Sequence, residues 1–348
     1  MKMHHLLSVS AIAVTCGAAL AAPVVSGCKT TLYSTVPSTY RPYTACFDAE
    51  GRLYLGSDNN DNTGELIRRV PAGGGPSEAI TTTRIYDADG VLVDITGAIT
   101  GVAGSVLVAS STFSGGGGQL SKIDASGGVS TFLTQGAELN NCDAMAIDAS
   151  GNLLINVPGN RTIARRTTAA FSTYINLGST TGSTLAIDDA NRLWVSCGDG
   201  VLRNYDISTS TPTQTLSVPV GGSEPGLGFC PAGIFGRSIY CVNRNAGLLY
   251  RVSSAGDLSL AGSGFPSGSY ALAFNERGEM FVPDWNTGNI WRLSCGADFN
   301  SDGFLTFEDF DEFVTAFEAG NPDSDFNKDG FLDFSDFDDF VQQFETGC

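Results

Sequence analysis

Histidine is nearly absent from this chain. Its 348 residues include two histidines, His4 and His5, at the extreme N-terminus. Residues 1–21 read as a secretory signal peptide, because an apolar stretch ends in the small residues Ala19-Leu-Ala21. Cleavage after this triplet leaves a mature chain without histidine. That excludes every mechanism in which imidazole acts as general base, general acid or metal ligand.

Long apolar runs are also missing after the signal peptide. A membrane-spanning helix needs about 18 or more consecutive apolar residues, and the mature sequence contains no such stretch. A lipoprotein signal is a competing interpretation of the N-terminus, because Val25-Ser-Gly-Cys28 fits a lipobox. In either case we expect an exported protein that is secreted or held at the cell surface, without a membrane span.

Positive charge is scarce and unevenly distributed. The chain has 19 Lys and Arg against 37 Asp and Glu, a formal net charge of −18. Residues 296–348 hold 15 acidic and one basic side chain, net −14, whereas residues 22–295 hold 22 acidic and 17 basic, net −5. The lack of a basic surface argues against a nucleic-acid partner. The acidic tail instead indicates a site for cations.

Nine cysteines become eight once Cys16 leaves with the signal peptide. An even number in an exported chain favours disulfides. Two pairings of Cys295 compete: with Cys28, across the two ends of the central region, or with Cys348, around the tail. Companion pairings are Cys230–Cys241 and Cys142–Cys197. The candidates are therefore Cys28, Cys46, Cys142, Cys197, Cys230, Cys241, Cys295 and Cys348.

The tail contains one 23-residue unit written twice, at 298–320 and 325–347, with 16 of 23 positions identical. Each copy opens with D-x-N-x-D-G and places a carboxylate at loop position 12. Calcium takes about six to eight oxygen ligands, and a loop of this design supplies them from positions 1, 3, 5, 7 and 12 around a Gly at position 6. The alternative, a pair of Asp/Asn/Gly turns before two acidic helices, is disfavoured by the tandem repetition. The sequence therefore predicts two bound Ca²⁺ ions.

The predicted ligands follow from these loop positions. They are Asp298, Asn300, Asp302, the Phe304 carbonyl, Thr306 and Asp309 in the first loop, and Asp325, Asn327, Asp329, the Phe331 carbonyl, Asp333 and Asp336 in the second.

The tail resembles the dockerin family of bacterial extracellular proteins. Position 12 is Asp309 and Asp336 rather than Glu, no helix precedes the first loop, and one amphipathic helix follows each loop. The resemblance implies attachment to a cohesin-like or cell-surface protein. Loop positions 10 and 11, which carry recognition residues in the family, depart from the usual small hydroxyls: they are Phe307-Glu308 and Phe334-Ser335.

Between Cys28 and Cys295 a second repeat is present. Six units share a short apolar strand, an Asp/Asn/Gly turn, a second strand, a polar hairpin and a third strand carrying Arg or Lys. The second strands are predicted to start at residues 53, 106, 153, 193, 239 and 280, so the period is mostly in the forties. The second unit is degenerate, and its first strand is placed at Ile99.

Such a period with four short strands per unit is typical of a β-propeller blade. We therefore predict a mainly β chain: a six-bladed β-propeller over 28–294 and a small all-α calcium-binding domain over 295–348. The strand at 30–36 is expected to complete the last blade and close the ring. The pattern resembles NHL-repeat and gluconolactonase-like propellers, while a β-helix and a β-sandwich remain alternatives.

The sequence is less informative about chemistry in the propeller. Gluconolactonase-like enzymes hold a divalent metal with Glu, Asn and Asp, but Glu50-Gly51 lies in a turn and does not match their Glu strand. Streptogramin lyase-like propellers use histidine, which is lacking here. The segment 58–64 is interpreted as a hairpin turn rather than a metal loop. Candidates for the mouth of the channel are Asp94, Asp143, Glu224 and Asp284.

Two classes of function remain open. In the first, a non-catalytic propeller binds a partner, glycan or peptide, and the dockerin-like tail attaches it to an assembly. In the second, the chain is an extracellular hydrolase or lyase acting on polysaccharides or lactones, with a carboxylate or metal-based site in the channel. The absence of histidine favours the first class. Two or three inward carboxylates with an Asn at one channel mouth would favour the second.

Overall fold

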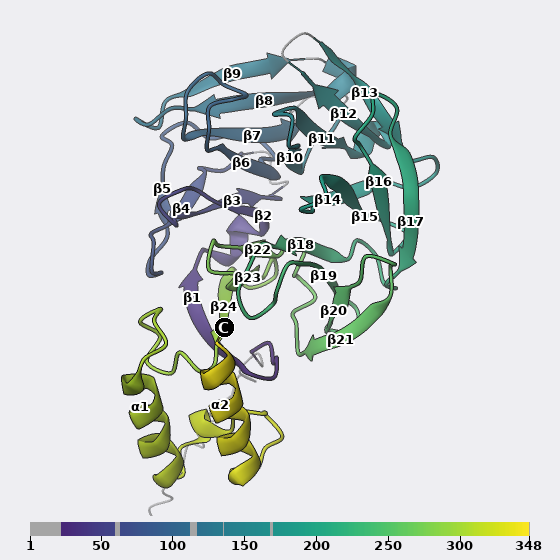
Figure 1. The fold of residues 1–348 in the computed structure, drawn as a ribbon. Helices are drawn as coiled ribbons and strands as arrows, with labels where there is room; N and C mark the ends of the chain where they lie inside the picture. Colours follow the sequence, from purple (N-terminus) through teal and green to yellow (C-terminus); the bar gives the residue numbers. More distant parts are fainter. Residues whose placement is uncertain (1–21, 60–62, 112–116, 135, 168–169, 348) are drawn as a thin grey trace, which may run out of the picture.

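The computed structural model describes residues 22–59, 63–111, 117–134, 136–167 and 170–347. The predicted signal peptide, 1–21, and Cys348 lie outside the described residues. Within them the chain forms six four-stranded antiparallel sheets arranged around a central channel, followed by two helices (Figure 1). The predicted six-bladed propeller is confirmed.

Each blade is numbered in chain order. Blade 1 contains β2 (Pro42–Phe47), β3 (Leu53–Ser57), β4 (Arg68–Val70) and β5 (Glu78–Ala79). Blade 2 contains β6 (Gly90–Asp94), β7 (Ser105–Ser111), β8 (Gly118–Ile123) and β9 (Val129–Thr134). Blade 3 contains β10 (Met145–Ile147), β11 (Leu153–Val157), β12 (Thr162–Arg166) and β13 (Phe171–Asn176).

The second half of the ring follows the same plan. Blade 4 contains β14 (Gly182–Ile187), β15 (Arg192–Cys197), β16 (Val201–Asp206) and β17 (Thr213–Pro219). Blade 5 contains β18 (Gly226–Cys230), β19 (Ser238–Asn243), β20 (Leu248–Val252) and β21 (Leu258–Ser263). Blade 6 contains β22 (Ala273–Phe274), β23 (Met280–Pro283), β24 (Asn289–Cys295) and β1 (Cys28–Thr35). Short 3-10 turns lie at Ser38–Tyr40, Gly136–Leu139, Pro158–Asn160 and Pro322–Ser324.

The ring closes through the two ends of the propeller segment. Strand β1 pairs antiparallel with β24 as the outer strand of blade 6, and Cys28 stands opposite Cys295 in the register. This is the predicted closure. It makes the last blade dependent on a strand from the beginning of the chain, so the propeller cannot complete its ring until both ends have been placed.

The core lies between neighbouring blades because both faces of each sheet are covered. Leu53, Tyr54 and Leu55 are consecutive in β3 and all are buried, which explains why the second strands read as continuous apolar runs. A typical inter-blade cluster joins Leu154 and Ile163 of blade 3 to Leu193 of blade 4. The observed second strands begin within one residue of the predicted positions.

One blade was misread from sequence. The inner strand of blade 2 is β6 at Gly90–Asp94, whereas the sequence pattern predicts that it starts at Ile99. The segment 95–104, between β6 and β7, consists of turns held partly by Asp94. In this segment Ile99 is buried in the core between blades 2 and 3, whereas Ile95 and Val102 are about half exposed, at 50% and 57%. The apolar pattern therefore marked a turn with one buried residue rather than a strand.

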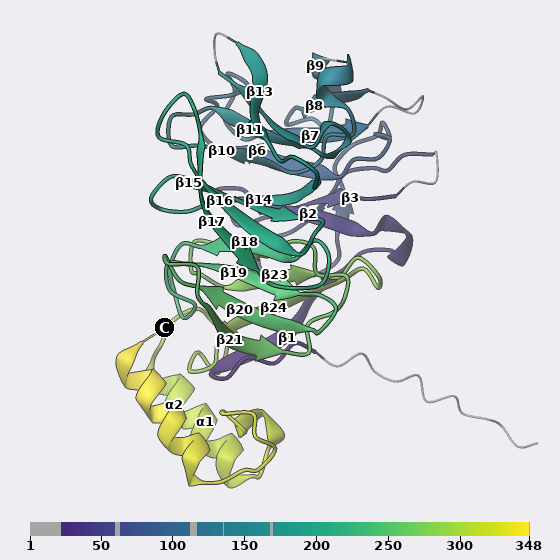
Figure 2. The same ribbon diagram turned by 90° about the vertical axis from the view of Figure 1, so that its right-hand side faces the viewer.

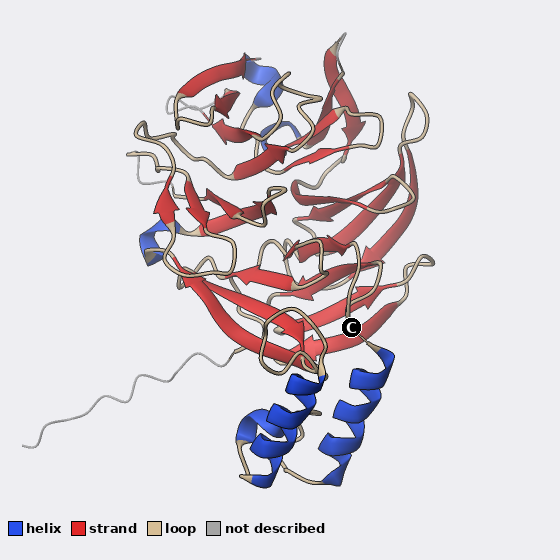
Figure 3. Ribbon diagram, turned by 60° about the vertical axis from the view of Figure 1, so that its left-hand side comes forward, coloured by secondary structure: helices blue, strands red, loops and turns tan. Residues whose placement is uncertain are grey.

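The tail forms two helices, α1 (Phe307–Glu318) and α2 (Phe334–Thr346), each begun by a capping box (Figure 3). Their apolar stripes face each other, and the rings of Phe313 and Phe340 stack with centroids 3.8 Å apart. Figures 1 and 2 show this pair of helices beside the closing strands β1 and β24. Among the described residues, no helix has the length and apolar character needed to cross a bilayer.

The described cysteines correct most of the predicted disulfides. Cys28, Cys46, Cys142, Cys197, Cys230 and Cys241 are free, while Cys295 is disulfide-bonded. The pairings Cys28–Cys295, Cys230–Cys241 and Cys142–Cys197 are therefore not formed. The favoured alternative partner of Cys295, Cys348, lies outside the described residues.

The companion pairings fail because their thiols belong to different cores. Cys230 packs between blades 5 and 6, whereas Cys241 packs between blades 4 and 5, on the opposite face of its sheet. Cys142 and Cys197 likewise lie in separate inter-blade clusters. Neighbouring backbone positions do not bring thiols together when their side chains enter different clusters.

Candidate functional site

Acidic side chains gather at one mouth of the central channel because of where the inner strands begin. Asp89 directly precedes β6, Asp143 lies just before β10, and Glu224 lies just before β18. Asp58 directly follows β3, which runs antiparallel to the inner strand of its own blade. The starts of the inner strands and the ends of the second strands share one mouth, so these carboxylates meet although they are far apart in sequence.

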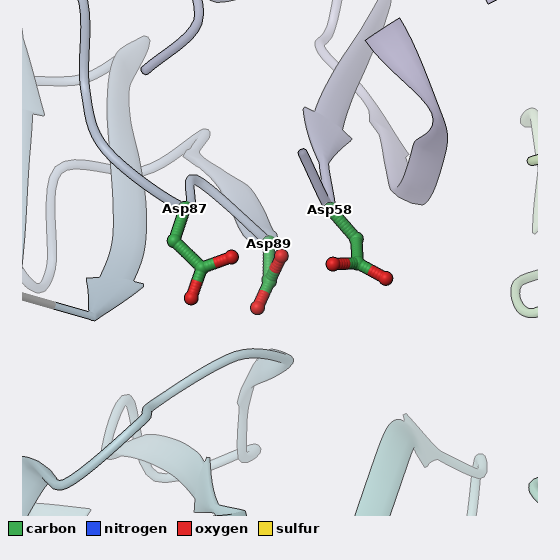
Figure 4. Close-up of side chains that lie close together, drawn as sticks. All are labelled: Asp58, Asp87 and Asp89. Carbon is green, nitrogen blue, oxygen red and sulfur yellow. The ribbon is translucent and has the colours of Figure 1, made fainter. Parts of the chain in front are cut away.

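Three acidic residues form a tight group. Carboxylate oxygens of Asp58, Asp87 and Asp89 all lie within 4.8 Å of one another (Figure 4). It is the only such group of His, Cys, Asp and Glu in the part of the chain that the structure describes. Asp87 and Asp89 are 5% and 7% exposed. Two buried carboxylates beside a third require protons or a cation to offset their charge.

The hydrogen bonds of the group leave oxygens available. Asp58 Oδ2 accepts a hydrogen bond of 3.1 Å from the Trp285 indole, and Asp87 Oδ2 accepts one from the Ser111 hydroxyl. The buried Oδ1 atoms of Asp87 and Asp89 have no hydrogen-bond partner. Buried acceptors without a partner are uncommon in folded proteins, and a bound water or ion is one way in which such oxygens are satisfied. Here they belong to carboxylates that crowd one another.

The group lies in a cavity of about 310 Å³ at the channel mouth. Asp143 and Glu224 extend the acidic wall, and Asn141 adds an amide. The lining residues are Tyr43, Asp58, Asp87, Asp89, Asn141, Asp143, Pro158, Thr181, Gly182, Glu224 and Tyr270. The arrangement therefore contains the inward carboxylates and the Asn that distinguish the second class of function from the first.

Aromatic rings form another side of the mouth. The rings of Tyr43 and Tyr270 lie 4.8 Å apart, and those of Tyr270 and Trp285 lie 6.2 Å apart. The Arg244 guanidinium stacks 3.6 Å from the Tyr270 ring and donates to three backbone carbonyls, those of Ser223, Glu224 and Ser267. These contacts fix the rim of the cavity.

The floor of the cavity is made by a side chain that crosses the channel. The hydroxyl groups of Tyr43 on β2 and Ser183 on β14 lie 2.7 Å apart. Thr181 and Gly182 line the upper cavity, and Thr184 lines a second cavity of about 230 Å³ surrounded by the inner strands. The Tyr43–Ser183 contact therefore separates the acidic mouth from the cavity between the inner strands.

Burial and mutual repulsion disturb the acidity of the cluster. Burial, reinforced by Asp87, Asp58 and Asp143, raises the pKa of Asp89 well above its usual value of 3.8. Burial also raises the pKa of Asp143, although its Oδ1 accepts hydrogen bonds from Asn156 Nδ2 and the Ala144 amide at 2.5 and 2.6 Å. Burial raises the pKa of Glu224 too, opposed by Arg244.

These residues fit a divalent metal ion. Three carboxylates within ligand distance, with unpartnered buried oxygens, offer the hard oxygen donors that Ca²⁺, Mg²⁺ and Mn²⁺ prefer. A cation would take the place of the protons that the crowded carboxylates otherwise hold. The donor set contains no imidazole or thiolate, so softer metals are less well matched.

The structure sorts the candidates predicted from sequence. It places Asp143 and Glu224 in the cavity. Asp94 caps a turn, with its Oδ2 accepting from the amides of Ile99 and Thr100. Asp284 likewise accepts from the Asn286 amide and the Thr287 hydroxyl. Asp94 and Asp284 are turn-forming residues outside the acidic cavity.

Sequence reasoning missed the tight group itself. Asp58 was assigned to a turn, but its carboxylate is part of the group. Asp87 and Asp89 were overlooked because the inner strand of blade 2 had been placed at Ile99 instead of Gly90. The available signal was positional: an Asp precedes the inner strand in blade 2 as it does in blade 3, at Asp143.

The two D-x-N-x-D-G loops of the tail have the turn geometry that their sequence predicts. Gly303 and Gly330 both have φ of 89°, as a sharp turn requires. Asp309 and Asp336 are fully buried and accept hydrogen bonds from backbone amides of their own loops, including those of Asn300 and Asn327.

The other predicted ligands lie on these loops and bond mainly to the loop backbone. Asp298 and Asp325 each accept a hydrogen bond at Oδ2 from the amide of the turn glycine and leave a buried Oδ1 without a partner. The remaining side chains accept from backbone amides, those of Thr306 and Asp333 as helix N-caps; they are Asn300, Asp302, Thr306, Asn327, Asp329 and Asp333. Phe304 and Phe331 are exposed. Calcium at these loops stays a prediction.

Comparison with known proteins supports the fold. No protein family model matches the chain. No curated protein sequence matches it either. Among solved structures, a gluconolactonase from Xanthomonas campestris is similar with a TM-score of 0.60 at 14% identity, covering 79% of this chain and 95% of that one.

Two further structures show the range of proteins with this architecture. A virginiamycin B lyase from Staphylococcus aureus has a TM-score of 0.54 at 11% identity, covering 77% of this chain and 99% of that one. An auxiliary nutrient binding protein from Bacteroides thetaiotaomicron has a TM-score of 0.56 at 10% identity, covering 73% of this chain and 69% of that one. At such low identities the similarity shows a shared six-bladed propeller and no more.

Proposed function

We propose that this chain is an exported, metal-assisted hydrolase or lyase that acts on lactones or polysaccharides at the mouth of its propeller channel. One observation carries the proposal: Asp87 and Asp89 present unpartnered buried oxygens beside Asp58 in a cavity that opens at the channel mouth. The gluconolactonase and the virginiamycin B lyase among the similar structures agree with this class, whereas the nutrient binding protein agrees with a propeller that only binds.

A divalent ion bound by these three carboxylates would polarise a carbonyl oxygen and lower the pKa of a coordinated water. The other residues of the mouth would hold and orient the substrate. Asp143 is kept in place by Asn156, and burial raises its pKa above the usual value, which favours its protonated, proton-donating form. Glu224, half-buried at the rim with a raised pKa, is the candidate acid or base nearest to solvent.

The aromatic wall provides the binding surface. Arg244 covers one face of the Tyr270 ring and Arg41 covers one face of the Trp285 ring. A sugar or lactone ring would pack against the parts of these two rings that the guanidinium groups leave uncovered, and the Tyr43–Ser183 floor would keep it at the mouth. The carboxylates repel anionic substrates unless the metal is present. Metal occupancy would therefore govern both binding of uronic acids and turnover.

The deciding experiment uses the full mature chain. The protein is stripped with chelator, reloaded with Ca²⁺, Mg²⁺, Mn²⁺ or Zn²⁺, and assayed against lactones, esters and uronic-acid polysaccharides. We expect metal-dependent turnover that Asp89→Asn abolishes and that Asp257→Asn, a change in a blade 5 hairpin outside the cavity, leaves intact. Binding without turnover at every metal would favour the non-catalytic class instead.

We further propose that the tail binds two Ca²⁺ ions and attaches the chain to an extracellular protein partner, as its resemblance to dockerins implies. Supporting this are the repeated turn glycines and the unpartnered Oδ1 atoms of Asp298 and Asp325. Calorimetry of the full chain should show sites lost one at a time in Asp298→Ala and Asp325→Ala. Unchanged uptake in both variants would reject this assignment.

A further inference from the structure

The two loops of the tail have nearly the same sequence but different surroundings. In the first loop, a Cβ built on the turn residue Gly303 would lie 1.9 Å from Nη1 of Arg277. In the second loop, the equivalent Gly330 has no neighbouring atom within 4 Å of such a Cβ. Arg277 belongs to the propeller, in the hairpin between β22 and β23. The propeller therefore covers the first loop and leaves the turn of the second open.

A second cation from the propeller reaches the same loop. Lys29 on β1 donates a hydrogen bond of 2.8 Å from Nζ to the carbonyl oxygen of Phe299, the second residue of the first loop. The corresponding carbonyl of the second loop, on Phe326, accepts from the neutral Gly27 amide at 3.4 Å. The two equivalent carbonyl oxygens therefore accept hydrogen bonds from donors of different charge: a positive ammonium group in the first loop and a neutral amide in the second.

The first loop remains suited to a cation despite these neighbours. Asp298 is 7% exposed, and its buried Oδ1 has no hydrogen-bond partner. Arg277 forms no ion pair with any described residue. Its guanidinium lies against the acidic first loop, and Arg277 also lines a cavity that contains Asp48 and Glu276. A divalent ion entering that loop would compete with the guanidinium for the same negative potential.

We propose that Arg277 of the propeller acts as a charge latch on the first loop. By this we mean that, while the tail packs against the propeller, the positive charge of Arg277 lowers the affinity of the first loop for divalent cations. The proposal rests on the calcium-binding role proposed above for the tail. Binding free energies are reciprocal, so an ion in the first loop weakens the contact with Arg277 to the same extent. The calcium affinity of the first loop thereby depends on Arg277, whereas that of the second loop does not.

The test is calorimetric titration of Ca²⁺ into the full mature chain carrying Asp325→Ala, which leaves the first loop as the intact tail site. Every variant in the comparison also carries Asp89→Asn, so that the site at the channel mouth does not bind Ca²⁺. On this background Arg277→Gln should tighten the first loop by about three- to tenfold, as expected for removal of one nearby charge. Arg277→Lys keeps the positive charge and should change the calcium affinity of the first loop little. Arg251→Gln, at an exposed arginine of blade 5, should not change this affinity.

Two further readouts identify the mechanism. The gain from Arg277→Gln should shrink as salt is raised, because mobile ions screen the interaction. In the reciprocal background, with Asp298→Ala in place of Asp325→Ala, Arg277→Gln should leave the second loop unchanged.

The possible failures are distinguishable. Equal calcium affinity of the first loop with and without the Arg277→Gln change would overturn the latch while leaving calcium binding intact. An equal gain at both loops would also overturn it, because it would show a general charge effect. Absence of uptake at both loops in every variant would reject the calcium-binding tail, and the latch with it.

Discussion

The side chains of Tyr43 and Ser183 meet across the full width of the channel, with their hydroxyl oxygens 2.7 Å apart. Tyr43 comes from the inner strand of blade 1 and Ser183 from that of blade 4, which are opposite each other in the ring. Both are buried. This contact defines the depth of the acidic mouth and joins two blades that share no sheet.

Removing the hydroxyl of Tyr43 should destabilise the propeller. In Tyr43→Phe the buried Ser183 hydroxyl loses its partner, so we expect a loss of about 1–3 kcal/mol in the free energy of unfolding. Denaturant titration measures it. The double variant with Ser183→Ala should recover part of the loss, since no unpaired hydroxyl then remains. Full stability in Tyr43→Phe would show that the contact contributes nothing.

The acidic mouth should make stability depend on pH when metal is absent. The pKa values of Asp89 and Asp143 are raised in the folded state above the value of 3.8. Their protonated forms stabilise the fold fully below that value, and this contribution is lost as pH rises through the folded-state pKa. In chelator, Tm should therefore fall as the pH is raised above 3.8, and Mn²⁺ or Ca²⁺ should restore it at the upper end of the pH range.

The variant Asp89→Asn isolates this effect from the general repulsion of an acidic chain. It should show a smaller fall of Tm with pH and a smaller gain on adding metal. A pH profile identical to that of the parent protein would mean that the cluster does not control stability.

The stacked pair Phe313 and Phe340 should hold the tail together. Both rings are fully buried, so Phe340→Ala should cost the tail about 3–5 kcal/mol through lost transfer energy and a cavity. The expected sign is loss of helical circular dichroism at 222 nm with retention of the β signal. The matched control is Phe334→Ala, whose ring is 79% exposed. A helical signal lost equally in both variants would contradict the assigned core.

Thiol labelling should distinguish Cys28 from Cys295. Burial raises the pKa of the Cys28 thiol to about 12, so it should resist alkylation in the folded protein and react after denaturation without reductant. Cys295 is disulfide-bonded and should react only after reduction. Non-reducing peptide mapping that joins Cys28 to Cys295 would contradict this.

Much of the fold followed from the sequence because its signals are local. Strand period, turn residues and the apolar second strands placed five blades correctly, and the stripes of α1 and α2 came from residues three and four apart. The inner strand of blade 2 differs from its predicted position because the turn at 95–104 also contains apolar residues, of which Ile99 is buried against blade 3 while Val102 is exposed. A single buried apolar residue occurs in a turn as well as in a strand, so apolar character alone does not distinguish the two.

The sequence by itself determined that histidine is confined to positions 4 and 5, that the chain has repeating blades, and that the tail holds two acidic turn-and-helix units. Tertiary structure alone decided where the carboxylates meet. Asp58 and Asp89 follow and precede strands of different blades, and only closure of the ring puts both at one mouth. It likewise decided that Arg277 covers one loop and not its repeat. Distances between blades depend on packing across the whole ring, which no local pattern of residues encodes.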